Sequence, residues 1–248
     1  MVSSAKMSFP IKFWTLVVNA LCLPLHVIRA LGLYGVYKRI FPFCLKRVSV
    51  SYNKKMHDNK AELFRSLSAF KKPGEQLTIL EIGCGTGANF EFYPPGAKVV
   101  CTDPNPYFRR FLKDSMKKND HLNYEQFVVA VGEDMASVGD ESVDVVVCTL
   151  VLCTVRDIPQ TLREAKRILK PGGALFFLEH VVADPSTWSY FFQHILQPFW
   201  FYFGDGCEAT RETWKHLEAA GFSELNLRHI EAPLIFIIKP HIIGYAVK

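Results

Sequence analysis

The cysteines of this chain lack the arrangements that mark a disulfide framework or a zinc-binding module. There are seven in 248 residues, an odd number: Cys22, Cys44, Cys84, Cys101, Cys148, Cys153 and Cys207. No two of them are separated by two residues, and no cysteine–histidine group has the spacing of a zinc-binding loop. Several lie in apolar runs, where a free thiol packs as a small hydrophobic group. We therefore expect reduced, structural thiols, no metal site and a domain that faces the cytosol.

Motifs of nucleic-acid-binding proteins are also missing. The chain has no zinc finger, no Arg-Gly-Gly tract and no repeat of basic and aromatic residues. Its net charge of +5 is unevenly distributed, because seven Lys or Arg residues and a single acid, Asp58, fall between Lys38 and Lys60. Beside an apolar segment, such a cluster favours an anionic membrane surface, although a solvated basic face is an equal alternative on charge alone. We expect no nucleic-acid partner.

Charged residues are absent from positions 13–28, which form most of an apolar N-terminal segment. A bilayer span needs about twenty apolar residues, and this run is shorter and is interrupted by Asn19, Pro24 and His26. Four interpretations are compatible with it: a cleaved signal peptide, a transmembrane helix, a buried hairpin of a soluble domain, or an anchor in one leaflet. No small-residue cleavage site follows, and the apolar character continues past Arg29. We expect residues 1–50 to be a retained hydrophobic anchor with a basic flank.

The remaining residues, 51–248, read as one domain in which strands and helices alternate. We expect strands at 77–82, 98–102, 127–131, 143–152 and 174–179, and helices at 56–70, 107–119 and 158–169, with a further helix beginning at 88–92. A helix at 210–220 and two strands at 224–230 and 242–247, which we expect to form a hairpin, complete the chain. Alternation of this kind predicts an α/β fold with a doubly wound, mostly parallel sheet.

Three alternating glycines follow the first expected strand of this domain. Gly83, Gly85 and Gly87 give the pattern GxGxG, with Glu81 just before it, and Asp103 ends the next expected strand. A glycine lets a ligand approach the backbone closely and tolerates a tight turn. A carboxylate about twenty residues further on suits the two hydroxyls of a ribose. Together these features predict a nucleoside-containing cofactor.

Five segments carry a resemblance to a known family: LEIGCGTGANF, CTDPNP, GEDM, DVVVCTLVLCTV and LKPGG. From about residue 77 onwards the chain resembles the seven-stranded, Rossmann-like class I S-adenosylmethionine-dependent methyltransferases. The stretches ANFEFYPPGAKVVCTDPNP, VDVVVCTLVLC, DGC with TRETWK, and PHIIGYAVK are similar to the microsomal alkyl-thiol methyltransferases. This resemblance implies S-adenosyl-L-methionine as cofactor, a small thiol as acceptor, and anchoring to the endoplasmic reticulum membrane and lipid droplets.

The resemblance also assigns roles at the methionine and ribose end of the cofactor. The glycine loop, including Cys84, would surround the methionine portion, and Glu81 would lie near its ammonium group. Asp103 would hold the ribose, and Asn105 would help at the ribose or the adenine edge.

At the adenine end, the resemblance implies an acid after the third strand. Both Glu133 and Asp134 are candidates, with Glu133 weighted slightly higher, and the choice stays open. Leu150 belongs to the segment 148–150 that would run past the cofactor at the carboxyl end of its strand.

The transfer step requires a nucleophile placed in line with the methyl group, about 3 Å away, with water excluded. A thiol ionises with a pKa of about 8.5, so a general base is optional. Glu179 and His180, at the end of the strand 174–179, are the candidate bases, followed by Asp205; His180 is preferred chemically, and a merely hydrogen-bonded histidine is the alternative. Nine of the sixteen residues from Trp188 to Phe203 are aromatic, which suits a lipophilic acceptor or a membrane contact.

The sequence therefore predicts a membrane-anchored S-adenosylmethionine-dependent S-methyltransferase for small lipophilic thiols. It assigns no oligomeric state. Two alternatives remain at this point. One is a binding protein of membrane or lipid-droplet surfaces with a vestigial methyltransferase fold, and the other is a methyltransferase for a lipid, RNA or protein acceptor.

Overall fold

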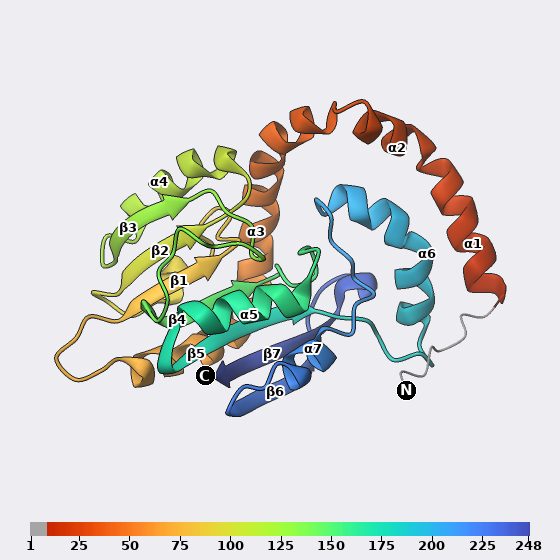
Figure 1. Ribbon diagram of the computed structural model, residues 1–248. Coiled ribbons are helices and arrows are strands. Elements are labelled where there is room, and N and C mark those ends of the chain that lie inside the picture. The colour runs from red at the N-terminus through yellow and green to blue at the C-terminus, as the bar shows by residue number, and fades with distance from the viewer. Residues whose placement is uncertain (1–8) are drawn as a thin grey trace.

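The computed structural model describes residues 9–248 of the chain. Its centre is a seven-stranded sheet with the order β3-β2-β1-β4-β5-β7-β6 (Figure 1). The strands are β1 Thr78–Ile82, β2 Lys98–Thr102, β3 Asn123–Val128, β4 Val143–Thr149, β5 Leu169–His180, β6 Glu224–Glu231 and β7 Pro240–Val247. The first five are parallel, and β7 lies antiparallel between β5 and β6. The expected mostly parallel sheet and the C-terminal hairpin are confirmed.

Helices cover both faces of the sheet because its central strands are apolar on both sides. Along β4, Val145 and Val147 face one core cluster, and Val146 and Cys148 face the other. The first cluster is covered by α3 Tyr34–Phe64, the 3₁₀ helix η1 Arg65–Phe70 and α4 Arg109–Lys118. The second is covered by α5 Ile158–Ile168 and α7 Thr213–Ala219. A strand that is buried on both faces reads as a continuous apolar run, as DVVVC does.

Three expected boundaries were wrong for identifiable reasons. The third strand lies at Asn123–Val128 rather than at 127–131, because an edge strand with one neighbour tolerates polar, exposed residues. β4 ends at Thr149 rather than at 152, because Leu150 adopts a positive φ of 57°. No α-helix begins at 88–92; only the 3₁₀ helix η2 Phe90–Phe92 forms before the Pro94-Pro95 pair, because two consecutive prolines remove two backbone N–H donors just after this short segment.

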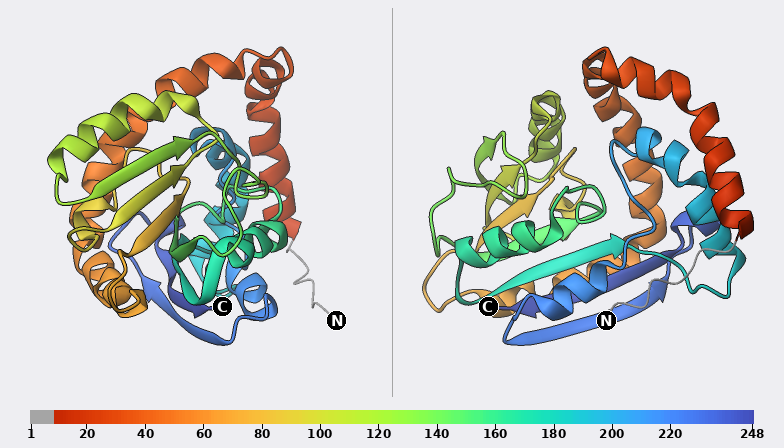
Figure 2. Two further views of the ribbon diagram at one scale, coloured as in Figure 1. Left: turned by 60° about the vertical axis from the view of Figure 1, so that its left-hand side comes forward. Right: turned by 45° about the vertical axis from the view of Figure 1, so that its right-hand side comes forward.

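The N-terminal residues form a curved row of helices, which we call the N-terminal arch: α1 Phe9–Leu21, α2 Leu23–Ala30 and α3 up to residue 50. The arch curves around α6 Trp188–Phe203, the aromatic helix (Figures 1 and 2). Helix α3 contains Pro42 and runs on through residue 50 to the sheet without a break. Among residues 9–248, none of the individual helices is both long and apolar enough to cross a membrane. The pair formed by α1 and α2, bent by 53°, meets that requirement only when taken together.

Candidate active site

The glycine loop follows β1 at the carboxyl edge of the sheet, where ligands of such sheets bind. Gly83, Gly85 and Gly87 all have positive φ angles, of 61°, 52° and 72°. A Cβ on Gly83 would lie 2.4 Å from a methyl carbon of Val151, and one on Gly87 would lie 2.8 Å from the ring of Phe90. Both the backbone conformation and the surrounding space therefore require glycine here. Cys84, within the loop, is buried against the core.

Asp103 lies directly against this loop. Its buried carboxylate accepts hydrogen bonds from the backbone N–H groups of Gly85, at 3.1 Å, and Asn105, at 2.8 Å. Burial raises the pKa of Asp103 to about 7. The side chain of Asn105 accepts from the Tyr107 N–H and donates to the carbonyl of Lys38 in α3. The structure thus brings together the glycine loop, Asp103 and Asn105, as the sequence predicted.

Glu81 is buried in a polar network beneath the loop. Its carboxylate accepts from Asn89 Nδ2 and from the Tyr93 hydroxyl, both at 2.7 Å. Burial raises the pKa of Glu81 to about 7, and its two hydrogen bonds partly offset that rise. Lys60, from α3, donates to Asn89 Oδ1 at 2.8 Å and is only 2% exposed. The sequence analysis missed these partners, although a lysine on the apolar face of a helix was a usable signal.

Helix α3 covers the glycine loop from the outside. A Cβ on Gly85 would lie 3.4 Å from the Leu45 side chain, and the hydroxyl groups of Ser49 and Thr86 are 3.4 Å apart. Asn53 donates to the carbonyl of Ala88. Part of the cofactor region is therefore walled by a segment that precedes the sheet in the sequence. No local pattern in that segment indicated this role.

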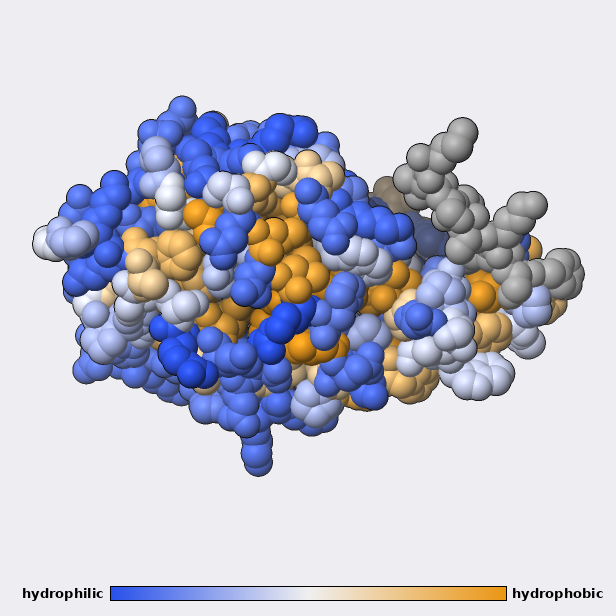
Figure 3. Space-filling view, turned by 90° about the horizontal axis from the view of Figure 1, so that it is seen from below, coloured by the Kyte–Doolittle hydropathy of each residue, from blue (hydrophilic) through white to orange (hydrophobic). Residues whose placement is uncertain are grey.

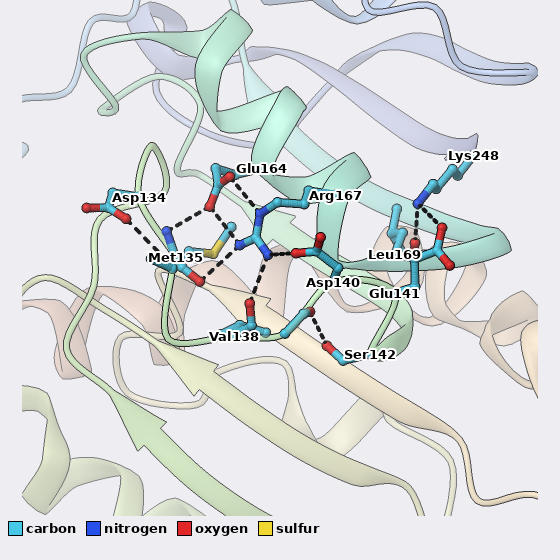
Figure 4. A network of polar contacts seen from close by, with 12 residues as sticks. Asp134, Met135, Val138, Asp140, Glu141, Ser142, Glu164, Arg167, Leu169 and Lys248 are labelled. Carbon is cyan, nitrogen blue, oxygen red and sulfur yellow. Dashed lines mark hydrogen bonds and ion pairs between the residues drawn. The ribbon is translucent and has the colours of Figure 1, made fainter.

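The two acids after β3 lie on a loop beside the end of β1. The carboxylate of Glu133 accepts from the backbone N–H of Arg156, and that of exposed Asp134 accepts from the N–H of Ala136 (Figure 4). A Cβ on Gly132 would lie 3.4 Å from the Ile82 side chain, which places this loop near the glycine loop. Asp134 thus closes a local turn, whereas Glu133 ties this loop to residues 156 and 157, just before α5. The choice between them as the adenine partner stays a prediction.

A charged network on α5 fixes this acidic loop. Arg167 donates to both carboxylate oxygens of Glu164, at 2.9 Å, and to the carbonyl groups of Met135 and Val138 (Figure 4). Glu164 in turn accepts from the Met135 N–H. The side chain of Met135 is fully buried, so the loop has little freedom to move.

The loop after β4 is held by Glu179. One oxygen of this buried carboxylate accepts from the Val151 N–H at 2.9 Å, and the other has no partner among residues 9–248. Burial raises the pKa of Glu179 well above its usual range. Leu150, at the start of the loop, donates its N–H to Leu178 and keeps its positive φ. A non-glycine residue in that conformation marks a constrained site.

Beside this loop, His180 meets two cysteines that the sequence analysis had treated as structural. His180 Nε2 lies 3.1 Å from Cys207 Sγ, and Cys153 completes a buried group whose ligand atoms lie within 4.8 Å of one another. A hydrogen bond with Cys207 lowers the pKa of Cys153 well below its usual range, and His180 lowers it further. Burial opposes a charge on His180, but Cys153 raises its pKa on balance. Spacing along the chain could not reveal this group, because its members come from three separate segments.

Asp205, the third candidate base, is directed elsewhere. Its carboxylate accepts from the Tyr34 hydroxyl at 2.8 Å, and its own φ is +50°. It thus joins the loop after α6 to the first turn of α3. Among the three candidates, His180 is the one that lies beside two cysteines.

The residues of this edge fit S-adenosylmethionine. The glycine loop turns through three positive φ angles at the carboxyl edge of the sheet, and Asp103 offers a carboxylate next to it. Buried carboxylates at Glu81 and Asp103 are the expected partners for an ammonium group and a ribose diol. The loop of residues 150–153 lies on the opposite side of Gly83, through Val151. This arrangement places a donor half and an acceptor half at the same edge.

The comparisons with known proteins agree with this geometry. Residues 80–177 match the family model described as a methyltransferase domain. The chain is 56% identical over 220 residues to human thiol S-methyltransferase TMT1A, covering 88% of this chain and 90% of that protein. It is 48% identical over 235 residues to human thiol S-methyltransferase TMT1B, covering 94% and 96% of the two chains.

The solved structures of similar proteins establish the fold. A SAM-dependent methyltransferase from Aquifex aeolicus superposes with a TM-score of 0.56 at 18% identity, over 83% of this chain and 97% of that one. The CurJ carbon methyltransferase superposes with a TM-score of 0.55 at 20% identity, over 76% and 53%. Sequence identity, coverage and the glycine loop with Asp103 together show that this chain belongs to the thiol S-methyltransferase family.

Proposed function

We propose that this protein transfers a methyl group from S-adenosylmethionine to the sulfur of small lipophilic thiols at a membrane surface. The observation that carries the proposal is the meeting, at one sheet edge, of the glycine loop and Asp103 with an acceptor side that is apolar. Val151, Leu152 and the aromatic helix α6 lie on that acceptor side. Its 56% identity to a thiol S-methyltransferase supports the choice of a thiol.

Each part of the chain has a defined task in this reaction. S-adenosylmethionine, when bound, supplies a methyl group on a positively charged sulfur. The glycine loop and Asp103 hold the donor, α3 covers it, and the loop held by Glu179 places the acceptor sulfur in line with the methyl carbon. Positioning two reactants in this way lowers the activation free energy by several kcal/mol. The reactants lose their translational and rotational entropy when they bind, before the transfer step.

Apolar exposure supports the membrane part of the proposal. Most large hydrophobic side chains that are exposed among residues 10–248 lie on the N-terminal arch and on α6; examples are Leu16, Leu21, Leu31, Trp188 and Phe199. Seen from below, the largest apolar surface lies at the centre of the face, framed by hydrophilic residues, and smaller apolar areas lie toward the end where α1 and α6 lie (Figure 3). An exposed apolar region of this kind marks a membrane or protein contact. We assign the contact to the cytosolic face of the endoplasmic reticulum membrane and to lipid droplets.

The test is methyl transfer from labelled S-adenosylmethionine by the full-length protein in detergent or lipid vesicles. The acceptors offered are a series of lipophilic thiols, matched alcohols, catechols, a phospholipid and RNA. We expect thiols alone to be methylated, and Asp103→Ala to abolish the transfer, while Asp58→Ala, on the exposed side of α3, keeps it. Binding of the cofactor with no methylation of any thiol would overturn the acceptor assignment. No cofactor binding would favour a surface-binding protein with a vestigial fold.

A further inference from the structure

Cys153, His180 and Cys207 form a compact group of soft ligands. They come from the loop after β4, the last residue of β5 and the loop after α6. All three side chains are buried, and one ligand atom from each lies within 4.8 Å of the other two. Two cysteines and one histidine are the protein ligands of one known type of catalytic zinc site, whose fourth position is open.

The distances within the group suit a tetrahedral ion. Zinc–sulfur bonds of about 2.3 Å and zinc–nitrogen bonds of about 2.0–2.1 Å place neighbouring ligand atoms about 3.5–3.8 Å apart. The separation of 3.1 Å between Cys207 Sγ and His180 Nε2 is a few tenths of an ångström shorter. A rotation of either side chain within its rotamer well is enough to open it.

Polar hydrogen-bonding groups lie beside both sulfur atoms. The indole N–H of Trp200 donates to Cys207 Sγ at 3.1 Å, and Thr154 Oγ1 lies 3.6 Å from Cys153 Sγ. Donors of this kind orient metal ligands from outside the coordination shell. His180 Nε2 is the ring nitrogen that lies against Cys207 Sγ, and Nδ1 is buried with no partner among residues 9–248.

The group lies where the acceptor must bind. His180 follows Glu179, which holds the Val151 N–H, and Val151 packs against Gly83 of the donor loop. From Cys207 the chain continues to Glu208, which lines an open groove of about 500 Å³ between the arch and α6. Gln197, which also lines this groove, donates to the carbonyl of Cys207 at 3.0 Å, so the groove lies beside the group.

We propose that Cys153, His180 and Cys207 bind one thiophilic divalent cation of the Zn²⁺ class, whose fourth position takes the acceptor thiol. This inference rests on the proposed function. The incoming thiol loses its proton to water and binds the cation as a thiolate, since a coordinated thiol is deprotonated outright. A lone pair of that sulfur forms the new sulfur–carbon bond. The carbon–sulfonium bond breaks, and its electron pair stays on the departing sulfur, so the donor leaves as a neutral thioether.

A metal ion would meet a need that the apolar acceptor side creates. A thiol in such surroundings is harder to ionise than in water, because burial opposes the charged form. Coordination reverses that preference without a protein base. It also fixes the sulfur at one point, which in-line transfer requires.

The first experiment measures metal content. Full-length protein is purified in detergent without chelators, under reducing conditions, and analysed by elemental mass spectrometry before and after dialysis against Zn²⁺. We expect about one equivalent per chain. Cys153→Ser, Cys207→Ser and His180→Asn should each lower the affinity for Zn²⁺ at least about tenfold. Cys44→Ser, an exposed thiol, and Cys101→Ala, a buried one in β2, should leave it unchanged.

A spectroscopic measurement guards against variants that fail to fold. Co²⁺ replaces Zn²⁺ in the unmodified protein, and we expect thiolate-to-cobalt charge-transfer bands with the intense visible bands of a tetrahedral ion. Addition of a lipophilic thiol should change the visible bands, because it enters the fourth position. Cys207→His, which keeps a ligand atom, should retain the ion with altered bands.

The outcomes separate this proposal from the proposed function. Metal binding that is weakened by substitution of Cys153, His180 or Cys207, without methylation of any thiol, would support the metal site and overturn only the proposed reaction. Thiol methylation at full rate by protein that binds neither Zn²⁺ nor Co²⁺ would overturn the metal site and keep the reaction. The metal site would also be overturned if the reduced protein takes up no cobalt and mild oxidation forms a disulfide between Cys153 and Cys207.

Discussion

The sheet and the N-terminal arch differ in how far their apolar side chains are buried. In the sheet, strands such as β4 bury both faces against helices of the same chain. In the arch, α2 has no buried residue at all, and leucines such as Leu21 and Leu31 are 74% and 67% exposed. The sheet is therefore stabilised within the chain, whereas the arch leaves much of its apolar surface exposed, which is the basis of the proposed membrane contact.

The largest expected effect lies in the packing of the sheet. A Cβ on Gly244, in β7, would lie 1.8 Å from the carbonyl oxygen of Asn226 in β6. We expect Gly244→Ala to lower the free energy of unfolding by about 3 kcal/mol, because the two strands must separate. Gly35→Ala, in the arch, meets nothing within 4 Å and should raise helix stability by about 0.5–1 kcal/mol. Chemical denaturation of both variants measures their free energies of unfolding. Equal changes in the two variants would contradict the difference between sheet and arch.

The next effect concerns the outward surface of the arch. Leu21→Ser combined with Leu31→Ser removes two exposed apolar side chains, each worth about 1.5–3 kcal/mol when buried in a membrane. We expect flotation with anionic lipid vesicles to show at least about a hundredfold weaker partitioning, with the free energy of unfolding in detergent changed by less than about 0.5 kcal/mol. Tyr124→Ser, at an exposed position in β3, is the matched control and should float normally. Unchanged flotation of the double variant would count against the membrane contact.

A smaller effect tests the part of α3 that continues from the arch to the sheet. Lys60→Met would leave the oxygen atoms of Asn53 and Asn89 without the charged donor that they now share. We expect a loss of about 1–3 kcal/mol in stability, the cost of unpaired buried polar groups. Calorimetry should also show weaker S-adenosylmethionine binding, because Asn89 positions Glu81. Lys55 is exposed on the same helix, so Lys55→Met should change neither the stability nor the affinity for S-adenosylmethionine.

A further prediction is a pH dependence of stability that arises at the sheet edge. Burial raises the pKa values of Glu81 and Asp103 to about 7, so the folded, ligand-free protein holds protons that the unfolded chain releases above about pH 4. Its free energy of unfolding should therefore fall as the pH rises from about 4 to about 7.

Cofactor affinity should change in the opposite direction. An ionised Asp103 accepts both ribose hydroxyls, so calorimetry should show affinity increasing by up to about tenfold per pH unit below pH 7. Asp103→Asn should flatten this profile, and Asp58→Asn, outside the site, should not. An affinity that is constant between pH 6 and pH 8 in the unmodified protein would contradict the assignment.

Residues whose roles follow from local spacing could be predicted from the sequence. The central strands, the glycine loop and Asp103 were placed correctly because apolar runs and glycine spacing reflect constraints within a few residues. The edge strand β3 was shifted, because exposure on both faces removes the apolar signal.

Contacts between distant segments could not be predicted. Cys153, His180 and Cys207 converge only after β4, β5 and α6 have packed together. The wall that Leu45 and Ser49 place over the glycine loop likewise depends on where α3 crosses the sheet. Of these residues only His180 stood out in the sequence, as a candidate base, and its two cysteine neighbours could be identified only from the folded structure.

Helix α3 has a practical consequence for anyone who wishes to prepare a smaller, more soluble enzyme. It runs from Tyr34 to Phe64, about 46 Å at 1.5 Å per residue. Its N-terminal part belongs to the arch, and its later residues cover the cofactor region. A truncation at residue 50 would remove Lys38, Leu45 and Ser49 and so open one wall of the donor site. Solubility is better sought by replacing outward-facing leucines while leaving the full length of this helix in place.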